Sequence, residues 1–432
     1  MNFAKILFLC GLVIFTYSPS YSQTKTSSKV IAQLLPLDPD VKIGKLANGF
    51  TYYIRKNMEP ENRAYLYLAN KVGSILENED QQGLAHFVEH MGFNGTKHYP
   101  KNDLVSYLQK AGVRFGADLN AYTSFDETVY ELPIPTDDVE VFKNGMQIMR
   151  DWAQDATLDP VEVDKERGVV LEEKRLGKGA YERMQIKYLP VLFNNSRYSN
   201  RLPIGTEEVL GNFKPETLRQ FYKDWYRPNL QALIVVGDID VQAVELMIKA
   251  KFADLKNPVD SRERIEYTIP LIHKNQFIAV TDKEFPVTVA QIMIKHPETV
   301  VKTTVDLRDN MIRALYNQML SARFSEIIKQ ANPPFLQGGS NISKFLAGLD
   351  VAGSFVLAKP GELETGFKAV LTEVERVKRF GFTQTEFERA KVAFMTEEES
   401  AYKEKDKTNS ENFVNEYLHH FLRGEAGVSI SY

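Results

Sequence analysis

The chain has 432 residues, of which 43% are hydrophobic and 25% are charged, and its formal net charge is −4. This length exceeds what one hydrophobic core supports and suits two domains of roughly 200 residues, while the ordinary composition predicts no large disordered region. The weakly acidic balance and the lack of a long basic run argue against a nucleic-acid partner.

The first residues have the pattern of a signal peptide, predicted to span 1–22. Lys5 supplies a short positive region, 6–15 is an apolar core, and Ser20 and Ser22 are small residues of the kind that precede a cleavage site. The core is too short for a membrane span. We therefore expect a periplasmic or secreted protein with no membrane span in the mature chain. An uncleaved N-terminal anchor is the alternative.

The only cysteine, Cys10, lies inside this apolar core. A mature chain without cysteine has neither disulfides nor thiolate ligands, so imidazole and carboxylate groups form its pool of metal ligands. Residues 23–40 are polar and punctuated by proline, which predicts an N-terminal arm.

The rest of the chain shows an internal repeat, with units predicted at 41–255 and 256–432. In the first unit, hydrophobic patterns predict strands, a hairpin and helices at 50–55, 64–72, 113–133, 137–156, 160–176, 231–236 and 241–252. The second unit repeats this order at 277–280, 288–294, 306–330, 336–358, 362–380 and 385–403. The same order predicts the same α+β fold twice, each unit having a mostly antiparallel sheet packed with helices.

The segment His86-Phe87-Val88-Glu89-His90, in the first unit, carries the most specific chemistry of the chain. On a helix, positions i and i+4 lie one above the other, so both imidazoles can face one metal ion, with Glu89 beside them. This H-x-x-E-H order is the inverzincin motif. Catalytic zinc usually has three protein ligands and one open position, and a neighbouring carboxylate then accepts the proton of the bound water.

An acidic stretch at 166–173 is the best source of a third ligand. Asp159 and Pro160 open a predicted helix in front of it. Glu166 and Glu173 are two turns apart and share a face, whereas Glu172 is turned about 100° away from Glu173. One face of this helix therefore offers both a metal ligand and a supporting carboxylate.

From about residue 46 onward the chain resembles the pitrilysin/insulinase family of zinc metallopeptidases, which includes the mitochondrial processing peptidase. The resemblance is carried by Gly83-Leu84-Ala85-His86-Phe87-Val88-Glu89-His90-Met91-Gly92-Phe93-Asn94-Gly95-Thr96, Asn120-Ala121-Tyr122-Thr123-Ser124 and Glu166-Arg167-Gly168-Val169-Val170-Leu171-Glu172-Glu173. It implies the fold of the processing peptidases, one Zn²⁺ ion per chain, Glu173 as the third ligand and Glu166 as a support for the site. It also implies that Asn120, Ala121 and Tyr122 form an edge strand that binds substrate.

The alternating pattern of 119–132 agrees with a half-buried strand. A free edge beside the zinc would let an extended peptide add through main-chain hydrogen bonds, which favours short or unfolded peptides as substrates. An ordinary edge strand without this function is the alternative.

These features predict a zinc-dependent endopeptidase with His86, His90 and Glu173 as ligands and Glu89 as proton acceptor. The helix predicted at 306–330 has no histidine, so the second unit is interpreted as a degenerate, non-catalytic copy. The other five histidines are predicted to be surface or internally satisfied residues: His98, His273, His296, His419 and His420. Family members enclose substrate between two halves, so a second half is expected, by homodimer or partner chain. The alternative is a non-catalytic or partner-dependent subunit of such an assembly.

Overall fold

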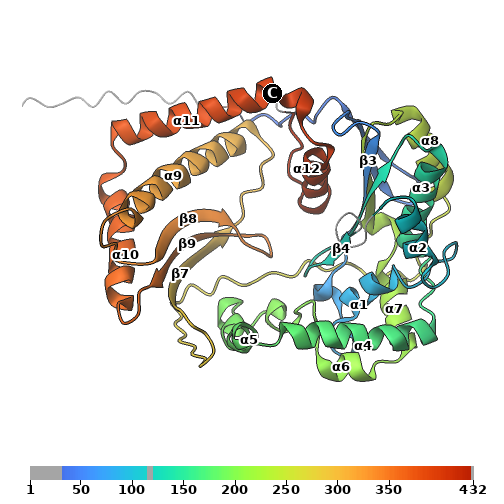
Figure 1. Cartoon of the computed structure of the whole chain (residues 1–432), viewed down its shortest axis with the longest axis horizontal. Coiled ribbons are helices and arrows are strands. Elements are labelled where there is room, and N and C mark those ends of the chain that lie inside the picture. Colours follow the sequence, from blue (N-terminus) through green and yellow to red (C-terminus); the bar gives the residue numbers. More distant parts are fainter. Residues whose placement is uncertain (1–31, 114–119, 430–432) are drawn as a thin grey trace, which may run out of the picture.

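Two β-sheets of unequal size carry the fold (Figure 1). This computed structural model describes residues 32–113 and 120–429, so the predicted signal peptide and the arm up to residue 31 lie outside the described residues. The first sheet has the strand order β1-β2-β6-β3-β5-β4, and the second has the order β7-β9-β8. None of the helices in the described part of the chain is both long enough and apolar enough to cross a membrane.

The first sheet is built almost entirely from antiparallel pairs, and only β2 and β6 run parallel. Its central strand β6 is buried at all seven residues, as expected for an apolar strand covered on both faces. The strands are β1 (Val41–Lys45), β2 (Thr51–Lys56), β3 (Arg63–Asn70), β4 (Asn120–Thr123), β5 (Thr128–Pro135) and β6 (Gln231–Gly237).

Helices cover one face of this sheet and form the largest core of the molecule. Its buried residues include Phe87, Met91, Trp152 and Ile248. The helices of the unit are α1 (Leu84–Met91), α2 (Asp103–Lys110), α3 (Val139–Gln154), α4 (Pro160–Gly177), α5 (Ala180–Leu192), α6 (Glu207–Asn212), α7 (Pro215–Trp225) and α8 (Val241–Phe252).

The other face is covered by the C-terminal helix α12 (Ser410–Arg423), which contacts β3 and β6. Val414 and Tyr417 of α12 are buried against Tyr53 and Tyr67 of the sheet, and Figure 1 shows α12 beside β3. The sequence did not predict this helix. Although it lies in the second half of the chain, it packs on the sheet of the first unit.

The second sheet packs against three long helices. Its elements are β7 (Thr288–Pro297), α9 (Thr304–Ile328), β8 (Gln337–Lys344), β9 (Leu349–Ala358), α10 (Leu363–Phe380) and α11 (Gln384–Lys403). Leu320 and Phe324 of α9 meet Val356 of β9 and Val370 of α10 in a separate small core. The order strand, helix, hairpin, two helices repeats that of the first unit, which confirms the predicted fold class.

The strand predicted at 277–280 is wrong, because residues 261–287 form no strand. Phe277 of this segment is 90% exposed. In the first unit the corresponding strand, β2, pairs with β1 and β6 and not with β3. The second sheet, in the described residues, has no counterpart of β6. The segment therefore has no strand to pair with.

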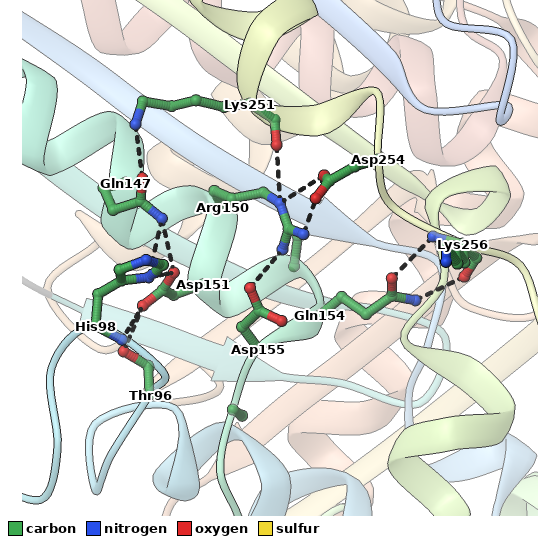
Figure 2. A network of polar contacts seen from close by, with 12 residues as sticks. Thr96, His98, Gln147, Arg150, Asp151, Gln154, Asp155, Lys251, Asp254 and Lys256 are labelled. Atoms are coloured by element: carbon green, nitrogen blue, oxygen red, sulfur yellow. Dashed lines mark hydrogen bonds and ion pairs between the residues drawn. The ribbon is translucent and has the colours of Figure 1, made fainter.

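A polar network joins α3 to α8 and to the loop that follows α1 (Figure 2). The side chain of Arg150 donates to the carbonyl of Lys251 at 2.8 Å. Asp151, which is fully buried, accepts the hydroxyl of Thr96 at 2.7 Å and the backbone N–H of His98 at 3.0 Å. The imidazole of His98 also contacts this carboxylate, at 2.8 Å. His98 thus anchors the loop after α1.

Candidate metal centre

The helix that carries the two motif histidines begins at a position without a side-chain cap. Gly83 is the N-cap residue, with φ 101°, and a Cβ there would lie 2.9 Å from the Cα of Gly205, so this position requires glycine. The buried carboxylate of Glu77 replaces the missing cap, accepting from the N–H of Gly83 at 3.0 Å and of Ala85 at 2.8 Å. Burial raises the pKa of Glu77 to about 8, although both hydrogen bonds lower it.

His86 and His90 point their Nε2 atoms toward the same place, 3.2 Å apart. Glu173 of α4 reaches the same place. One carboxylate oxygen lies 3.7 Å from Nε2 of His86, and the other lies 3.3 Å from Nε2 of His90. Within residues 32–113 and 120–429, these three form the one group of His, Cys, Asp and Glu whose ligand atoms all lie within 4.8 Å of one another.

Glu166 orients one of these imidazoles. Its Oε1 lies 2.8 Å from Nδ1 of His90, and its Oε2 accepts from the side-chain amide of Asn94 at 2.5 Å. A proton on Nδ1 leaves Nε2 with a free lone pair, which is how carboxylates commonly prepare a histidine ligand. Burial lowers the pKa of His90, but the hydrogen bond and charge of Glu166 outweigh it and raise the pKa overall.

The donor set fits a zinc ion. Two imidazole nitrogens and one carboxylate oxygen converge, which is a ligand combination of catalytic zinc sites. Burial, with a smaller contribution from His90, lowers the pKa of His86 to about 4, so its ring is neutral at physiological pH and has a lone pair to offer. The buried Nδ1 of His86 has no hydrogen-bond partner in the described residues. These residues could hold one Zn²⁺ ion.

Glu89 lies on the same helix but is not part of this group. It is 8% exposed, and its Oε2 accepts the hydroxyl of Thr123 at 2.6 Å. Burial raises the pKa of Glu89 to about 7, against the hydrogen bond of Thr123, which lowers it. A carboxyl group with such a pKa can accept and release a proton near neutral pH.

The predicted substrate strand lies beside the motif helix. β4 contacts α1 and pairs with β5 on one side, whereas its other edge has no strand neighbour in the described part of the chain. Asn120 and Tyr122 are exposed, and Ala121 is half-buried. Thr123, the last residue of the strand, joins it to Glu89.

Sequence reasoning missed three residues that shape this centre: Glu77, Asn94 and Thr123. Asn94 and Thr123 lie inside the segments that carry the family resemblance. The sequence alone does not reveal their contacts, because these depend on tertiary packing. Glu77 lies six residues before Gly83, and no local spacing rule links a carboxylate to a helix at that distance. Trp152 of α3 also fixes the end of α1, since its indole donates to the carbonyl of Gly92 at 2.8 Å.

Comparisons with known proteins identify the family of this chain. Residues 52–195 match the insulinase family (peptidase family M16), and residues 212–394 match the inactive domain of peptidase family M16. A zinc protease PQQL-like protein of Arabidopsis thaliana is 33% identical over 390 residues, which are 90% of this chain and 38% of that protein. A probable zinc protease PqqL of Escherichia coli is 33% identical over 370 residues, which are 85% of this chain and 40% of that protein.

Among solved structures, the first half of the periplasmic protease PqqL from Escherichia coli matches with a TM-score of 0.85 and 30% identity, over 92% of this chain and 85% of that chain. The duplicated fold is thus that of a family whose members include proteins named as zinc proteases. The chain belongs to the insulinase family of peptidases, family M16, as the resemblance implied. It spans less than half the length of the curated relatives named above.

Proposed function

We propose that this chain is the catalytic half of a zinc-dependent endopeptidase that cleaves peptides or unfolded segments. The observation that carries the proposal is the convergence of His86, His90 and Glu173, with Glu89 on the same helix and outside the ligand group. The zinc-protease names of the relatives support the same reaction class.

A bound zinc ion supplies Lewis-acid chemistry, polarising a carbonyl and acidifying water. The chain's own residues move the protons. Glu89 accepts the proton of the attacking water and later delivers it to the leaving amine, and its pKa of about 7 suits both tasks. Thr123 holds the Glu89 carboxylate in place and favours its ionised form, and Glu166 holds the ring of His90.

The free edge of β4 is the proposed binding site for substrate. An extended peptide can add to this edge by main-chain hydrogen bonds, and Asn120, Ala121 and Tyr122 would contact it. Because β4 contacts the helix that carries Glu89, a peptide bound there lies beside the proposed catalytic group. Binding through the backbone favours unstructured substrates and gives weak sequence specificity.

We also propose that the active enzyme contains a second half, as a homodimer or with a partner chain. The chain covers 40% or less of the length of two zinc-protease relatives and matches a solved first half. The periplasm is the proposed compartment, since that first half belongs to a periplasmic protease and the N-terminal sequence has the pattern of a signal peptide.

The test combines metal analysis with a peptide-cleavage assay. The purified chain is expected to contain one zinc per chain and to cleave an unstructured, internally quenched peptide. A chelator should abolish cleavage, and added zinc should restore it. Cleavage that survives complete removal of zinc would overturn the proposal.

A second series follows specific activity against protein concentration, together with the size of the particle. Activity that rises as the chain associates supports a two-half enzyme. A strict monomer with high, concentration-independent activity would show that a second half is not needed. If the chain binds zinc but cleaves no peptide at any concentration or with any partner, the alternative of a non-catalytic subunit is favoured.

A further inference from the structure

The strand β5 begins with a threonine that is completely buried. Thr128 is the first residue of β5 and lies directly opposite Thr123, the last residue of β4. The two hydroxyl oxygens are 3.3 Å apart. The hydroxyl of Thr123 is also the group that donates to Oε2 of Glu89 at 2.6 Å. Thr128 is therefore linked through one other side chain to the proposed catalytic carboxylate.

The direction of these hydrogen bonds follows from the number of protons. A threonine hydroxyl has one proton to donate and can also accept. When Glu89 is ionised, the proton of Thr123 goes to it, so Thr128 is the donor to Thr123. Thr128 also donates to the carbonyl of Val72 at 2.8 Å, and its proton is then shared between two acceptors in a bifurcated hydrogen bond. A Thr123 hydroxyl that accepts from Thr128 has its own proton turned toward Glu89.

Two buried amide side chains fix Thr128 from the side of the sheet. Asn70, the last residue of β3, donates from its side chain to the carbonyl of Thr128 at 3.0 Å. Gln231, the first residue of β6, donates to Oδ1 of Asn70 at 2.8 Å and to the carbonyl of Ala153 in α3 at 2.7 Å. Asn70, Thr128 and Gln231 are fully buried and come from three adjacent strands. Their hydrogen bonds therefore tie the start of β5 to the centre of the first sheet and to α3.

A pair of buried tyrosines holds the main chain next to Glu89. The hydroxyl of Tyr130 donates to the carbonyl of Val88 at 3.4 Å and lies 3.3 Å from the hydroxyl of Tyr226. Both tyrosines are 1% exposed. Tyr130 follows Thr128 by two residues, so the two side chains lie on the same face of β5. This one face of the strand contacts the motif helix and, through Thr123, the carboxylate of Glu89.

Polar groups in such a buried place need a reason. Burial of a polar group costs free energy unless it is hydrogen-bonded, so an apolar layer at this end of the sheet would avoid that cost. A hydrogen-bonded network supplies rigidity and a unique arrangement instead. Here the network ends at the carboxylate of Glu89, a group whose position decides whether it can accept a proton.

We propose that Thr128 is a positioning residue of the peptidase site: it orients the hydroxyl of Thr123, which in turn holds the carboxylate of Glu89. This inference rests on the proposed function, because it deepens the role given to Glu89. Thr128 is fully buried and does not contact substrate. Its loss should therefore lower kcat and leave KM and zinc content unchanged.

The first experiment is Thr128→Val, which removes the hydroxyl and keeps the shape of the side chain. We expect kcat for an internally quenched peptide to fall about 2- to 10-fold, the range for one neutral hydrogen bond. Thr128→Ser keeps the hydroxyl and should restore kcat. The matched control is Ser354→Ala in the second sheet, where the hydroxyl of Ser354 donates across the strands to Ser340 at 2.9 Å, and its kcat should equal that of the wild type. Full kcat in Thr128→Val, a change in KM alone, or no rescue by Thr128→Ser would overturn the proposal.

A double-mutant cycle separates positioning through Thr123 from a merely structural role. If Thr128 acts through Thr123, the change Thr128→Val should have no further effect on kcat in a chain that already carries Thr123→Val. A structural role predicts instead that the two factors multiply. Multiplying factors would contradict the proposed path to Glu89.

A crystal structure of Thr128→Val tests the inference without any activity. The contact between Oγ1 of Thr123 and Oε2 of Glu89, 2.6 Å in the wild type, should lengthen beyond hydrogen-bond range, and an unchanged contact would overturn the proposal. If Thr128→Val does not fold, Thr128→Ala takes its place, because it also lacks the hydroxyl and leaves more room. A wild-type chain that cleaves no peptide would count against the proposed function, and the structural comparison would still decide the role of Thr128.

Discussion

Thr123→Val is the most informative change near the proposed catalytic carboxylate, because it removes one hydroxyl and keeps the shape of the side chain. The hydroxyl donates to Oε2 of Glu89 at 2.6 Å, a distance typical of a hydrogen bond to a carboxylate. It favours the ionised form and opposes the effect of burial, which raises the pKa of Glu89.

A hydrogen bond to a charged group contributes about 1.5–3 kcal/mol, and about 1.4 kcal/mol corresponds to a tenfold change in an equilibrium constant. If the ionised form of Glu89 loses this stabilisation, its pKa rises further. Fewer molecules then have a carboxylate ready to accept a proton at pH 7. We expect kcat/KM at pH 7 to fall about 10- to 100-fold.

The assay is the pH dependence of kcat/KM for an internally quenched peptide. Glu89 acts as a base, so kcat/KM rises with pH through the pKa of Glu89. This rising part of the profile is its acid limb, and a raised pKa moves it to higher pH. Thr123→Ser keeps the hydroxyl and is the matched control. If Thr123→Val lowers the rate without moving the acid limb, the hydrogen bond does not act through the ionisation of Glu89, and the reasoning is refuted.

Two further predictions concern metal affinity and stability. Glu166→Gln is expected to lower the zinc affinity about 10- to 100-fold, and Glu173→Gln should lower it more. Metal titration with Glu172→Gln as the control measures both, and the opposite order would make Glu166 the ligand. Burial raises the pKa of Glu416 from 4.5 to about 7, so between these two pH values the folded chain keeps a proton that the unfolded chain releases. The free energy of unfolding that this group contributes therefore declines as the pH rises from 4.5 to about 7. Glu416→Gln should therefore unfold at higher denaturant than the wild type at pH 8 and lose this advantage below pH 4.5, whereas an advantage that persists at low pH would contradict the assignment.

The repeat and the fold class could be predicted because they depend on local patterns. Hydrophobic periodicity and helix-start signals such as Asp159-Pro160 act within one element, and they located the elements from α3 to α4 and from β7 to α11 within a few residues. The spacing of His86, Glu89 and His90 likewise follows from helix geometry alone.

The remaining features depend on contacts between distant parts of the chain. The residues of α12 have helical spacing, but nothing local shows that Val414 and Tyr417 pack on the first sheet instead of the second. The contact between Thr123 and Glu89 joins a strand to a helix 34 residues away. The prediction of a strand at 277–280 failed for a related reason, since a strand needs a partner and sequence pattern alone does not supply one.

The role of Glu89 is the central claim of this account, and Glu89→Gln tests it most directly. The substitution keeps the size of the side chain and removes the proton acceptor, while His86, His90 and Glu173 remain. Zinc content by elemental analysis should stay at one per chain, and kcat for an unstructured peptide should fall by several orders of magnitude. Zinc retained together with wild-type kcat would contradict the assignment of Glu89 as the proton acceptor.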